Sequence, residues 1–279
     1  MTLVSIGDQV TGGTYPFHSR FRRAVNFRCG NQLISVVDEE IGEGPLNIVI
    51  REFNGESTCV DAAPLVIGGN MVVLGSLRFH FTAADHYHSA VDLEDWDPHL
   101  FDRNLFVFEE ELRTASSPKS LAFLLDEHRT MNFRPGFERA FTDQIRRGVH
   151  QMMNGHLLDG VRTLRGCGLG LTPSGDDFIA GLLIGLNLLQ QLRGQNYQEI
   201  ADEVFRTAKA GNIFSNSFLD LARRGLLFGR MKNLVLALMH ESEEMVRKSA
   251  ARLMAIGGSS GADLGTGFLL TVRGEMGVS

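Results

Sequence analysis

The residues with the most specific chemical potential lie between positions 166 and 177, which read GCGLGLTPSGDD. Glycines let backbone N–H groups approach an anion closely, and the start of a helix adds partial positive charge. Such a loop can bind a phosphate or a carboxylate, with hydroxyl groups as further donors. The residues we expect to contact a small anionic substrate in this loop are Gly168, Gly170, Thr172, Ser174 and Gly175.

Two adjacent carboxylates, Asp176 and Asp177, follow the glycines directly. Either could cap the helix that the next apolar residues predict, because the first N–H groups of a helix have no intrahelical acceptor. Capping accounts for one aspartate but not for two. A spare carboxylate could act as a base, or could hold Mg²⁺ against a bound phosphate. The two aspartates therefore do not by themselves require a cofactor, and Mg²⁺ is the metal that they could bind.

A second copy of this pattern begins 86 residues after the first. Residues 174–183 read SGDDFIAGLL and residues 260–269 read SGADLGTGFL, so both contain SGxDxxxGxL. The glycines of each copy predict that the two helices pack together, since they let another helix backbone approach. We expect this packing to bring three carboxylates into one pocket, as catalytic residues or as ligands of a metal: Asp176, Asp177 and Asp263. The second loop adds three expected substrate-binding residues: Ser259, Ser260 and Gly261.

Other candidate groups carry weaker signals. His86 and His88 would face the same side of a strand and could bind a metal, but acidic, loop-like residues surround them, which favours a solvated connection. Ser215 and Ser217 fall at a predicted helix start, where they could be caps or could reach the pocket of the two loops. Cys167 has no histidine at an obvious catalytic spacing, so its position favours a buried neutral thiol.

The elements that must position these residues divide the chain into a β-rich part and a helical part. Runs of β-branched and aromatic residues separated by turn sequences predict five strands, at 24–27, 33–37, 46–50, 71–79 and 105–112. After Ser116, Ser117 and Pro118 the apolar residues recur at helical spacing. We therefore predict an α+β fold, with an antiparallel β barrel or sandwich over residues 1–115 and an all-helical domain over residues 116–279 that carries both SGxD loops.

Composition narrows the possible functions. Of the 279 residues 43% are apolar, enough for a sizeable core, and a formal charge of −6 without a long basic run argues against a nucleic-acid surface. The most apolar stretch, residues 178–189, is too short to cross a bilayer, so we expect no membrane role. Cys29, Cys59 and Cys167 are widely separated, which indicates neither a disulfide framework nor a zinc site. These features, with an N-terminus unlike a signal peptide, predict a cytoplasmic protein.

The two glycine-rich stretches resemble a known family. GCGLGLTPSGDDFIAGLL and IGGSSGADLGTGFLL are similar to the paired signatures of a bacterial family formerly known as a domain of unknown function, now associated with the AllH-type subunit of oxamate carbamoyltransferase. GEGPLNIVI (42–50) and SNSFLDLARRG (215–225) also resemble parts of that family. One position departs from its pattern, because Leu169 stands where the family often has proline.

This resemblance implies a cytoplasmic role in allantoin and purine nitrogen breakdown, where oxamate and carbamoyl phosphate interconvert with oxalurate and phosphate. It also implies further carbamoyltransferase subunits as partners, and a homo-oligomer is compatible with it. The Ser-x-Arg-Thr-Arg phosphate signature of ordinary aspartate and ornithine carbamoyltransferases is absent from this sequence. Any transferase activity would therefore use a different site architecture.

Three functions remain open at this level. The leading hypothesis is a transferase subunit acting on carbamoyl phosphate or a related acyl phosphate, a reaction that needs donors around a phosphate leaving group. A second is a Mg²⁺-dependent hydrolase of a small phosphate compound, with the three aspartates as oxygen ligands. The third is a non-catalytic partner that binds a small anion and orders a separate catalytic subunit.

Overall fold

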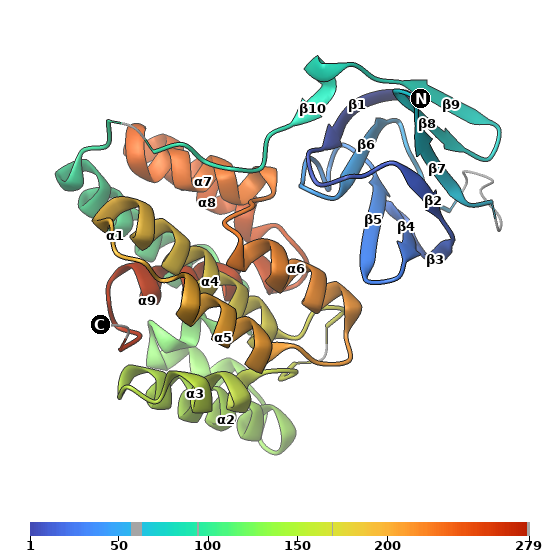
Figure 1. Ribbon diagram of the computed structural model, residues 1–279. Helices are drawn as coiled ribbons and strands as arrows, with labels where there is room; N and C mark the ends of the chain where they lie inside the picture. The colour runs from blue at the N-terminus through green and yellow to red at the C-terminus, as the bar shows by residue number, and fades with distance from the viewer. Residues whose placement is uncertain (57–62, 94, 169, 278–279) are drawn as a thin grey trace. The chain divides into compact units, whose positions relative to one another are not determined.

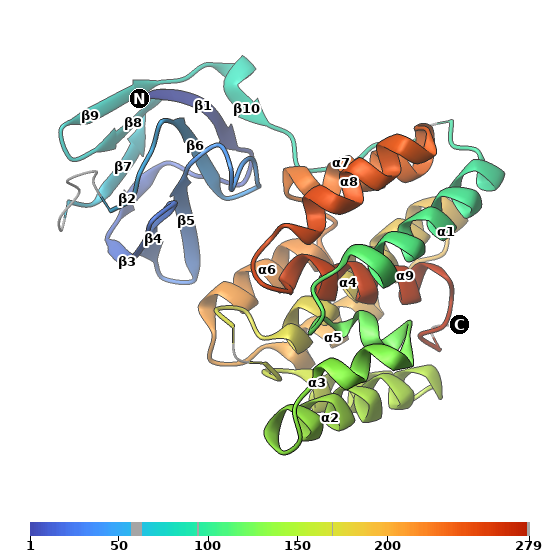
Figure 2. The ribbon, with the colours of Figure 1, turned by 180° about the vertical axis from the view of Figure 1, so that it is seen from behind.

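The computed structural model describes residues 1–56, 63–93, 95–168 and 170–277 (Figures 1 and 2). The chain divides into two compact units, one of residues 1–90 with 226–232 and one of residues 91–225 with 233–279. Cys59 and Leu169 lie outside the described residues. Among the residues that are described, no helix is both long enough and apolar enough to cross a membrane.

The first unit consists mainly of two β-sheets. Its strands are β1 (Thr2–Gly7), β2 (Gly13–Tyr15), β3 (Phe17–Phe21), β4 (Ala24–Cys29), β5 (Gln32–Val37), β6 (Asn47–Arg51), β7 (Leu65–Gly68), β8 (Met71–Leu74), β9 (Leu77–His80) and β10 (His86–Tyr87). One sheet has the order β10-β1-β6-β5-β4-β3 and the other the order β2-β7-β8-β9. Neighbouring strands are antiparallel except in the pairs β1–β10 and β5–β6.

Side chains of both sheets meet in one hydrophobic core. Phe27 and Ile48 enter it from the six-stranded sheet, and Leu65 and Leu74 enter it from the four-stranded sheet. In β7 the buried and exposed residues alternate, as expected for a strand with one face on a core. The predicted fold class, an antiparallel-rich β part followed by a helical part, is thereby confirmed.

The second unit is helical. Its α-helices are α1 (Pro98–Ala115), α2 (Phe137–Met153), α3 (Leu157–Leu164), α4 (Ser174–Arg193), α5 (Gln198–Ala208), α6 (Ile213–Arg223), α8 (Glu243–Met254) and α9 (Ser260–Val272), together with most of α7 (Gly229–His240). Two 3₁₀ helices, η2 (Leu121–Leu124) and η3 (Glu127–Asn132), connect α1 to α2. α4 is buried on nearly all sides, which agrees with its nearly continuous apolar sequence.

One of the predicted strands is wrong, because residues 105–112 belong to helix α1. Asp97 caps this helix by accepting a hydrogen bond from the backbone N–H of His99 at 2.9 Å, and Pro98 occupies its first turn. Its buried apolar residues recur at helical spacing: Phe101, Leu105, Phe108 and Leu112. A short apolar run by itself does not distinguish a strand from a buried helix segment, and the residues upstream of the run decide between them.

Residues 71–79 also differ from the single strand predicted there. They form β8 and β9, separated by a turn in which Gly75 has a φ of +59°, a conformation that favours glycine. The two units divide between Ala90 and Val91, whereas the predicted boundary lies at the end of α1, and residues 226–232 group with the first unit.

Candidate functional site

Helices α4 and α9 pack directly backbone to backbone. A Cβ atom added at Gly181 would lie 2.0 Å from the carbonyl oxygen of Leu264, and one added at Gly267 would lie 2.1 Å from that of Phe178. Only a residue without a Cβ permits this approach. Gly181 and Gly267 occupy the same position in the two SGxDxxxGxL copies, so the packing predicted from the repeat is confirmed.

The two helices run in the same direction and start at the same end. Gly181 lies against Leu264, near the start of α9, whereas Gly185 lies one turn further along α4 and faces Thr271, near the end of α9. The partial positive charges of both helix N-termini therefore come together. This common start is where the sequence places its candidate residues.

The repeat extends beyond the motif to the preceding helices. A Cβ at Gly175 would lie 1.9 Å from the carbonyl oxygen of Leu164 at the end of α3, and a Cβ at Gly261 would lie 1.9 Å from that of Leu253 near the end of α8. The pairs α3–α4 and α8–α9 are thus two copies of one helix–loop–helix unit. Gly175 and Gly261 serve this close packing of each loop on its helices.

The loop that precedes α4 is longer than the loop that precedes α9, and it is followed by one more aspartate. Gly175 follows Leu164 by 11 positions, whereas Gly261 follows Leu253 by 8. Asp176 stands where the second copy has an alanine, and its carboxylate accepts a hydrogen bond from the backbone N–H of Gly166 at 2.7 Å. The structure therefore gives Asp176 a local role, in which it holds the first turn of the longer loop against α4.

This role leads to a first prediction. Replacing Asp176 by alanine is expected to lower the free energy of unfolding by about 1 to 2 kcal/mol, because the Gly166 N–H loses a charged acceptor. Urea denaturation of the variant and the wild type measures the difference. A matched substitution of the exposed Asp159 to alanine is expected to change it by less than about 0.5 kcal/mol. Equal effects of the two substitutions would contradict the assigned role.

The carboxylates of Asp177 and Asp263 each lie beside a serine of the other copy. The hydroxyl of Ser260, which begins α9, lies beside the carboxylate of Asp177 in α4 and favours its charged form. The hydroxyl of Ser174, which begins α4, lies beside the carboxylate of Asp263 in α9 and favours its charged form. Each helix start therefore faces the carboxylate of the other, so the structure brings together Asp177 and Asp263, two of the three aspartates expected in one pocket. We call Asp177 and Asp263 the carboxylate pair.

Further donors surround the carboxylate pair. Thr172 Oγ1 donates to Asp177 at 3.2 Å, and Ser259 Oγ donates to Asp263 at 2.8 Å. The backbone N–H of Leu121, the first residue of η2, donates to Asp263 at 2.6 Å. Nothing in the local sequence indicates the Leu121 contact, because the donor is a backbone group contributed by a segment remote along the chain.

Burial raises the pKa values of both members of the pair. Asp177 is 3% exposed and Asp263 is 0% exposed. Burial raises the pKa of Asp177 well above its ordinary value, and the charge of Asp263 raises it further, against the hydrogen bonds from Ser260 and Thr172. Burial also raises the pKa of Asp263 to about 7, although its N–H and hydroxyl donors favour the charged form. The pKa of Asp263 therefore lies close to neutral pH, where this carboxyl group can exchange a proton.

The hydroxyl groups around the pair are more accessible than the carboxylates themselves. Four residues, which we call the hydroxyl rim, are half-buried: Thr172, Ser174, Ser259 and Ser260. Thr172 Oγ1 and Ser260 Oγ lie 3.5 Å apart, so the rim connects the two loops. This arrangement offers hydroxyl donors at two helix N-termini, with carboxyl groups behind them that can exchange a proton.

The start of α6 lies beside the first loop. Asn212 caps α6 by accepting hydrogen bonds from the backbone N–H groups of Phe214 and Ser215, and its Nδ2 donates to the carbonyl oxygen of Leu171 at 2.7 Å. Asn212, and not Ser215 or Ser217, is therefore the cap, which its position before an apolar helix could have indicated. Ser215 Oγ is buried and has no hydrogen-bond partner among the described residues.

The glycine loop itself is folded against its own helix. A Cβ at Gly168, which has a φ of +137°, would lie 2.4 Å from the backbone nitrogen of Ser174, and the N–H of Gly175 donates to the carbonyl oxygen of Cys167 at 2.8 Å. The loop backbone thus covers part of the N-terminus of α4. Gly170 lies close to Thr172, where a Cβ would be 2.8 Å from the carbonyl oxygen. These glycines allow tight local packing, and their contact with a substrate stays a prediction.

The weaker candidates show no catalytic arrangement. The Cys167 thiol is half-buried and donates to the carbonyl oxygen of Thr163 at 3.2 Å. Burial raises its pKa, and the charge of Asp176 raises it further, as expected for a neutral thiol. His86 lies in β10 and His88 follows that strand, both in the β-rich unit.

Metal binding by the three aspartates has no geometric support. Within the described ranges, no three or more His, Cys, Asp or Glu side chains are grouped so that they could hold a metal ion. Asp176 is turned to the Gly166 N–H, and both members of the carboxylate pair accept hydrogen bonds from protein donors. The donor set is therefore suited to holding the two loops and does not fit a resident Mg²⁺ ion.

Residues 164–272 match the model of a protein family described as oxamate carbamoyltransferase subunit AllH. This segment begins at the last residue of α3 and ends at the last residue of α9, so it contains both loops and both helices of the central pair. The resemblance seen at residues 215–225 lies inside it, whereas the one at 42–50 lies outside. No curated protein and no solved structure matches the chain.

Proposed function

We propose that this chain is a subunit of a carbamoyltransferase and that the common start of α4 and α9 binds its small anionic substrate. The observation that carries the proposal is the crosswise placement of Ser260 beside Asp177 and of Ser174 beside Asp263, where two helix N-termini converge. The family match over residues 164–272 supports the reaction class. The proposed reactants are carbamoyl phosphate and oxamate, which yield oxalurate and phosphate in the cytoplasmic breakdown of allantoin and purine nitrogen.

The hydroxyl rim suits an anion when the carboxylate pair is partly protonated. A protonated carboxyl group of Asp263 donates its hydrogen to the hydroxyl oxygen of Ser174 or Ser259. That hydroxyl is then free to direct its own hydrogen to a phosphate or carboxylate oxygen. Both helix dipoles favour negative charge at the same place. Gly168, Gly170, Gly175 and Gly261 would shape the backbone around the anion.

The carboxylate pair can also move the proton that the transfer requires. The amide nitrogen of oxamate attacks the carbonyl carbon of carbamoyl phosphate, a new C–N bond forms, and the C–O bond to phosphate breaks. The nitrogen loses one proton during this step, and the ionised member of the pair accepts it. Asp177 is the member of the pair that can reach the substrate, because it lies next to Thr172 in the accessible rim, whereas Asp263 is fully buried; it accepts the proton in the fraction of the protein in which Asp177 is ionised and Asp263 is protonated. Asp263 then acts through its effect on the pKa of Asp177.

A partner subunit is proposed to complete this site. All four residues of the hydroxyl rim are partly exposed in the chain by itself. Because catalysis of group transfer benefits from exclusion of water, a rim at the protein surface would function best when another chain covers it. The description of the matched family as a subunit agrees with this requirement.

Ligand binding tests the proposal. Carbamoyl phosphate is expected to raise the melting temperature of the chain, or of its complex with its partner subunits, because it binds only the folded state. The double variant Thr172→Val with Ser260→Ala is expected to weaken this binding about tenfold, or roughly 1.4 kcal/mol, as two hydroxyl donors are lost. Titration calorimetry with carbamoyl phosphate, and separately with inorganic phosphate, gives the dissociation constants.

Ser242→Ala is the matched control. Ser242 precedes α8, is exposed and makes no side-chain capping hydrogen bond, so its replacement leaves the paired loops intact. Unchanged affinity in this variant and reduced affinity in the double variant would support the proposed site. Equal affinity in all three proteins, or formation of oxalurate at the wild-type rate by a complex carrying Asp177→Asn, would refute it.

A further inference from the structure

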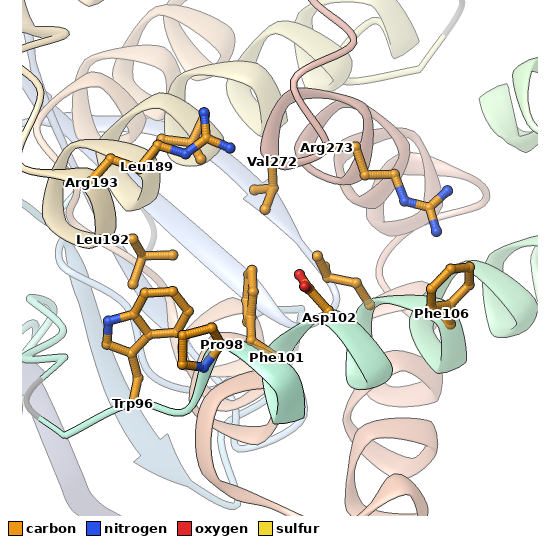
Figure 3. A pocket seen from close by; sticks show the side chains of 11 residues that line it. Trp96, Pro98, Phe101, Asp102, Phe106, Leu189, Leu192, Arg193, Val272 and Arg273 are labelled. Atoms are coloured by element: carbon orange, nitrogen blue, oxygen red, sulfur yellow. The ribbon is translucent and has the colours of Figure 1, made fainter.

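A cavity lies at the C-terminal ends of α4 and α9, whereas the two SGxD loops lie at their N-terminal ends. It has a volume of about 610 Å³ and is bounded by the beginning of α1, the last residues of α4 and the last residues of α9 (Figure 3). We call it the end cavity. Val272, one of its lining residues, follows Asp263 by nine positions along α9, a helical distance of about 14 Å, so the end cavity is separate from the carboxylate pair.

The body of the end cavity is apolar and aromatic. Trp96 and Phe101 line it and contact each other edge to face, with ring centroids 5.8 Å apart and an interplanar angle of 85°. Leu192 and Val272 line it from the ends of α4 and α9. Its size is within the range of roughly 300 to 1,000 Å³ that is usual for small-molecule sites. A planar ring would find both aromatic and aliphatic surface here.

Three charged side chains border this apolar space. Figure 3 shows the Asp102 carboxylate directed away from α1 into the space, with Arg193 and Arg273 on the side of α4 and α9. Arg273 forms an ion pair with Glu109 and lies over the ring of Phe106. The side chains of Arg193 and Asp102 form no ion pair or hydrogen bond with any other described residue. One cation and one anion are therefore available beside the aromatic surface.

We propose that the end cavity binds a small molecule that combines an aromatic ring, an anionic group and a hydrogen-bond donor. The ring lies against Trp96 and Phe101, the anionic group pairs with the Arg193 guanidinium, and the donor is accepted by Asp102. Arginine suits either a carboxylate or a phosphate because its N–H groups match both in a bidentate manner. An aromatic amino acid and a nucleoside monophosphate both carry the required set of groups, and binding experiments separate them.

The fluorescence of Trp96 reports occupancy directly, because it is the only tryptophan of the chain. Titration of the whole protein with L-phenylalanine and, separately, with AMP is expected to change its emission saturably for one of the two, with a dissociation constant of roughly 0.1 to 1 mM. Phenylacetate lacks the ammonium donor, adenosine lacks the anionic group, and inorganic phosphate lacks the ring. Each of these three is expected to bind at least tenfold more weakly than the complete ligand.

Substitutions of the two charged lining residues test the proposed contacts with the ligand. Arg193→Gln is expected to weaken binding of the complete ligand about tenfold, and Asp102→Asn to weaken it by a smaller factor. Arg206→Gln is the control, because Arg206 is an exposed arginine in the last turn of α5 and does not line the cavity. The proposal is overturned if neither L-phenylalanine nor AMP changes Trp96 emission saturably, or if Arg193→Gln and Arg206→Gln bind alike. Binding of adenosine as tight as that of AMP would also overturn it if AMP is the ligand.

Discussion

Replacing Gly181 by alanine is expected to destabilise the helical unit by about 3 kcal/mol or more, which lowers its melting temperature by roughly 6 to 12 °C. The added Cβ would lie 2.0 Å from the carbonyl oxygen of Leu264 and 2.7 Å from the backbone nitrogen of Phe268. Both contacts are with backbone atoms of α9, so no side-chain rotation relieves them. The helices must separate, which also disturbs the contacts between the two loops at their N-termini.

A graded series of glycine variants makes this prediction specific. Gly267→Ala is expected to match Gly181→Ala, because its Cβ would lie 2.1 Å from the carbonyl oxygen of Phe178. Gly185→Ala should cost less, because its nearest neighbours are side-chain atoms of Thr271 at 2.7 Å. Gly258→Ala is the control, with nothing within 4 Å and no positive φ. Calorimetric melting that fails to rank Gly181 and Gly267 above Gly258 would show that the helices are not packed this closely.

Stability of the wild type is expected to fall as the pH rises from 5 to 8, with the ionisation of Asp263 contributing on the order of 2 to 3 kcal/mol. The folded protein holds this proton up to a pKa of about 7, whereas the unfolded chain releases it near 4. Between these values the folded state binds more protons, so raising the pH favours unfolding. Below pH 4 and above pH 7 this contribution becomes constant. Asp177 acts in the same direction, since its pKa is also raised.

Asp263→Asn is expected to flatten this pH dependence and to equal or exceed the wild type in stability at pH 8. The asparagine oxygen can still accept from the Leu121 N–H, and its amide hydrogens can reach hydroxyl oxygens of Ser174 and Ser259. Asp159→Asn removes an exposed charge and controls for the effect of net charge. Urea denaturation between pH 5 and pH 8 gives the slopes. A wild-type slope that survives in Asp263→Asn would mean that other groups bind the proton.

The glycine series and the pH series test different parts of the proposed function. The glycine series tests the scaffold that brings the two loops together, and it is independent of any ligand. The pH series tests whether the carboxylate pair holds a proton that could be exchanged during carbamoyl transfer. A stable scaffold without the raised pKa values would leave anion binding possible but would remove the proposed acid–base role of Asp177.

Much of the architecture was already present in local sequence patterns. Runs of β-branched residues such as 33–37 and the turn residues between them indicate strands, and the repeated SGxDxxxGxL motif predicts two helices that meet through glycines. These signals are local, or they repeat, so they can be recognised without knowing the fold. The segment 105–112 misled this reasoning because it has β-forming residues, while its helical spacing becomes visible only with Phe101 and the Asp97 cap included.

The chain sequence alone determined that two aspartates, Asp177 and Asp263, occupy equivalent positions at the starts of two glycine-containing helices. Only the tertiary structure decided that each lies beside the serine of the other copy, that Asp176 secures the longer loop, and that a backbone N–H from Leu121 reaches Asp263. The physical reason is that helix propensity and motif spacing act over a few residues, whereas burial, charge coupling and pKa depend on which distant groups displace water from a carboxylate.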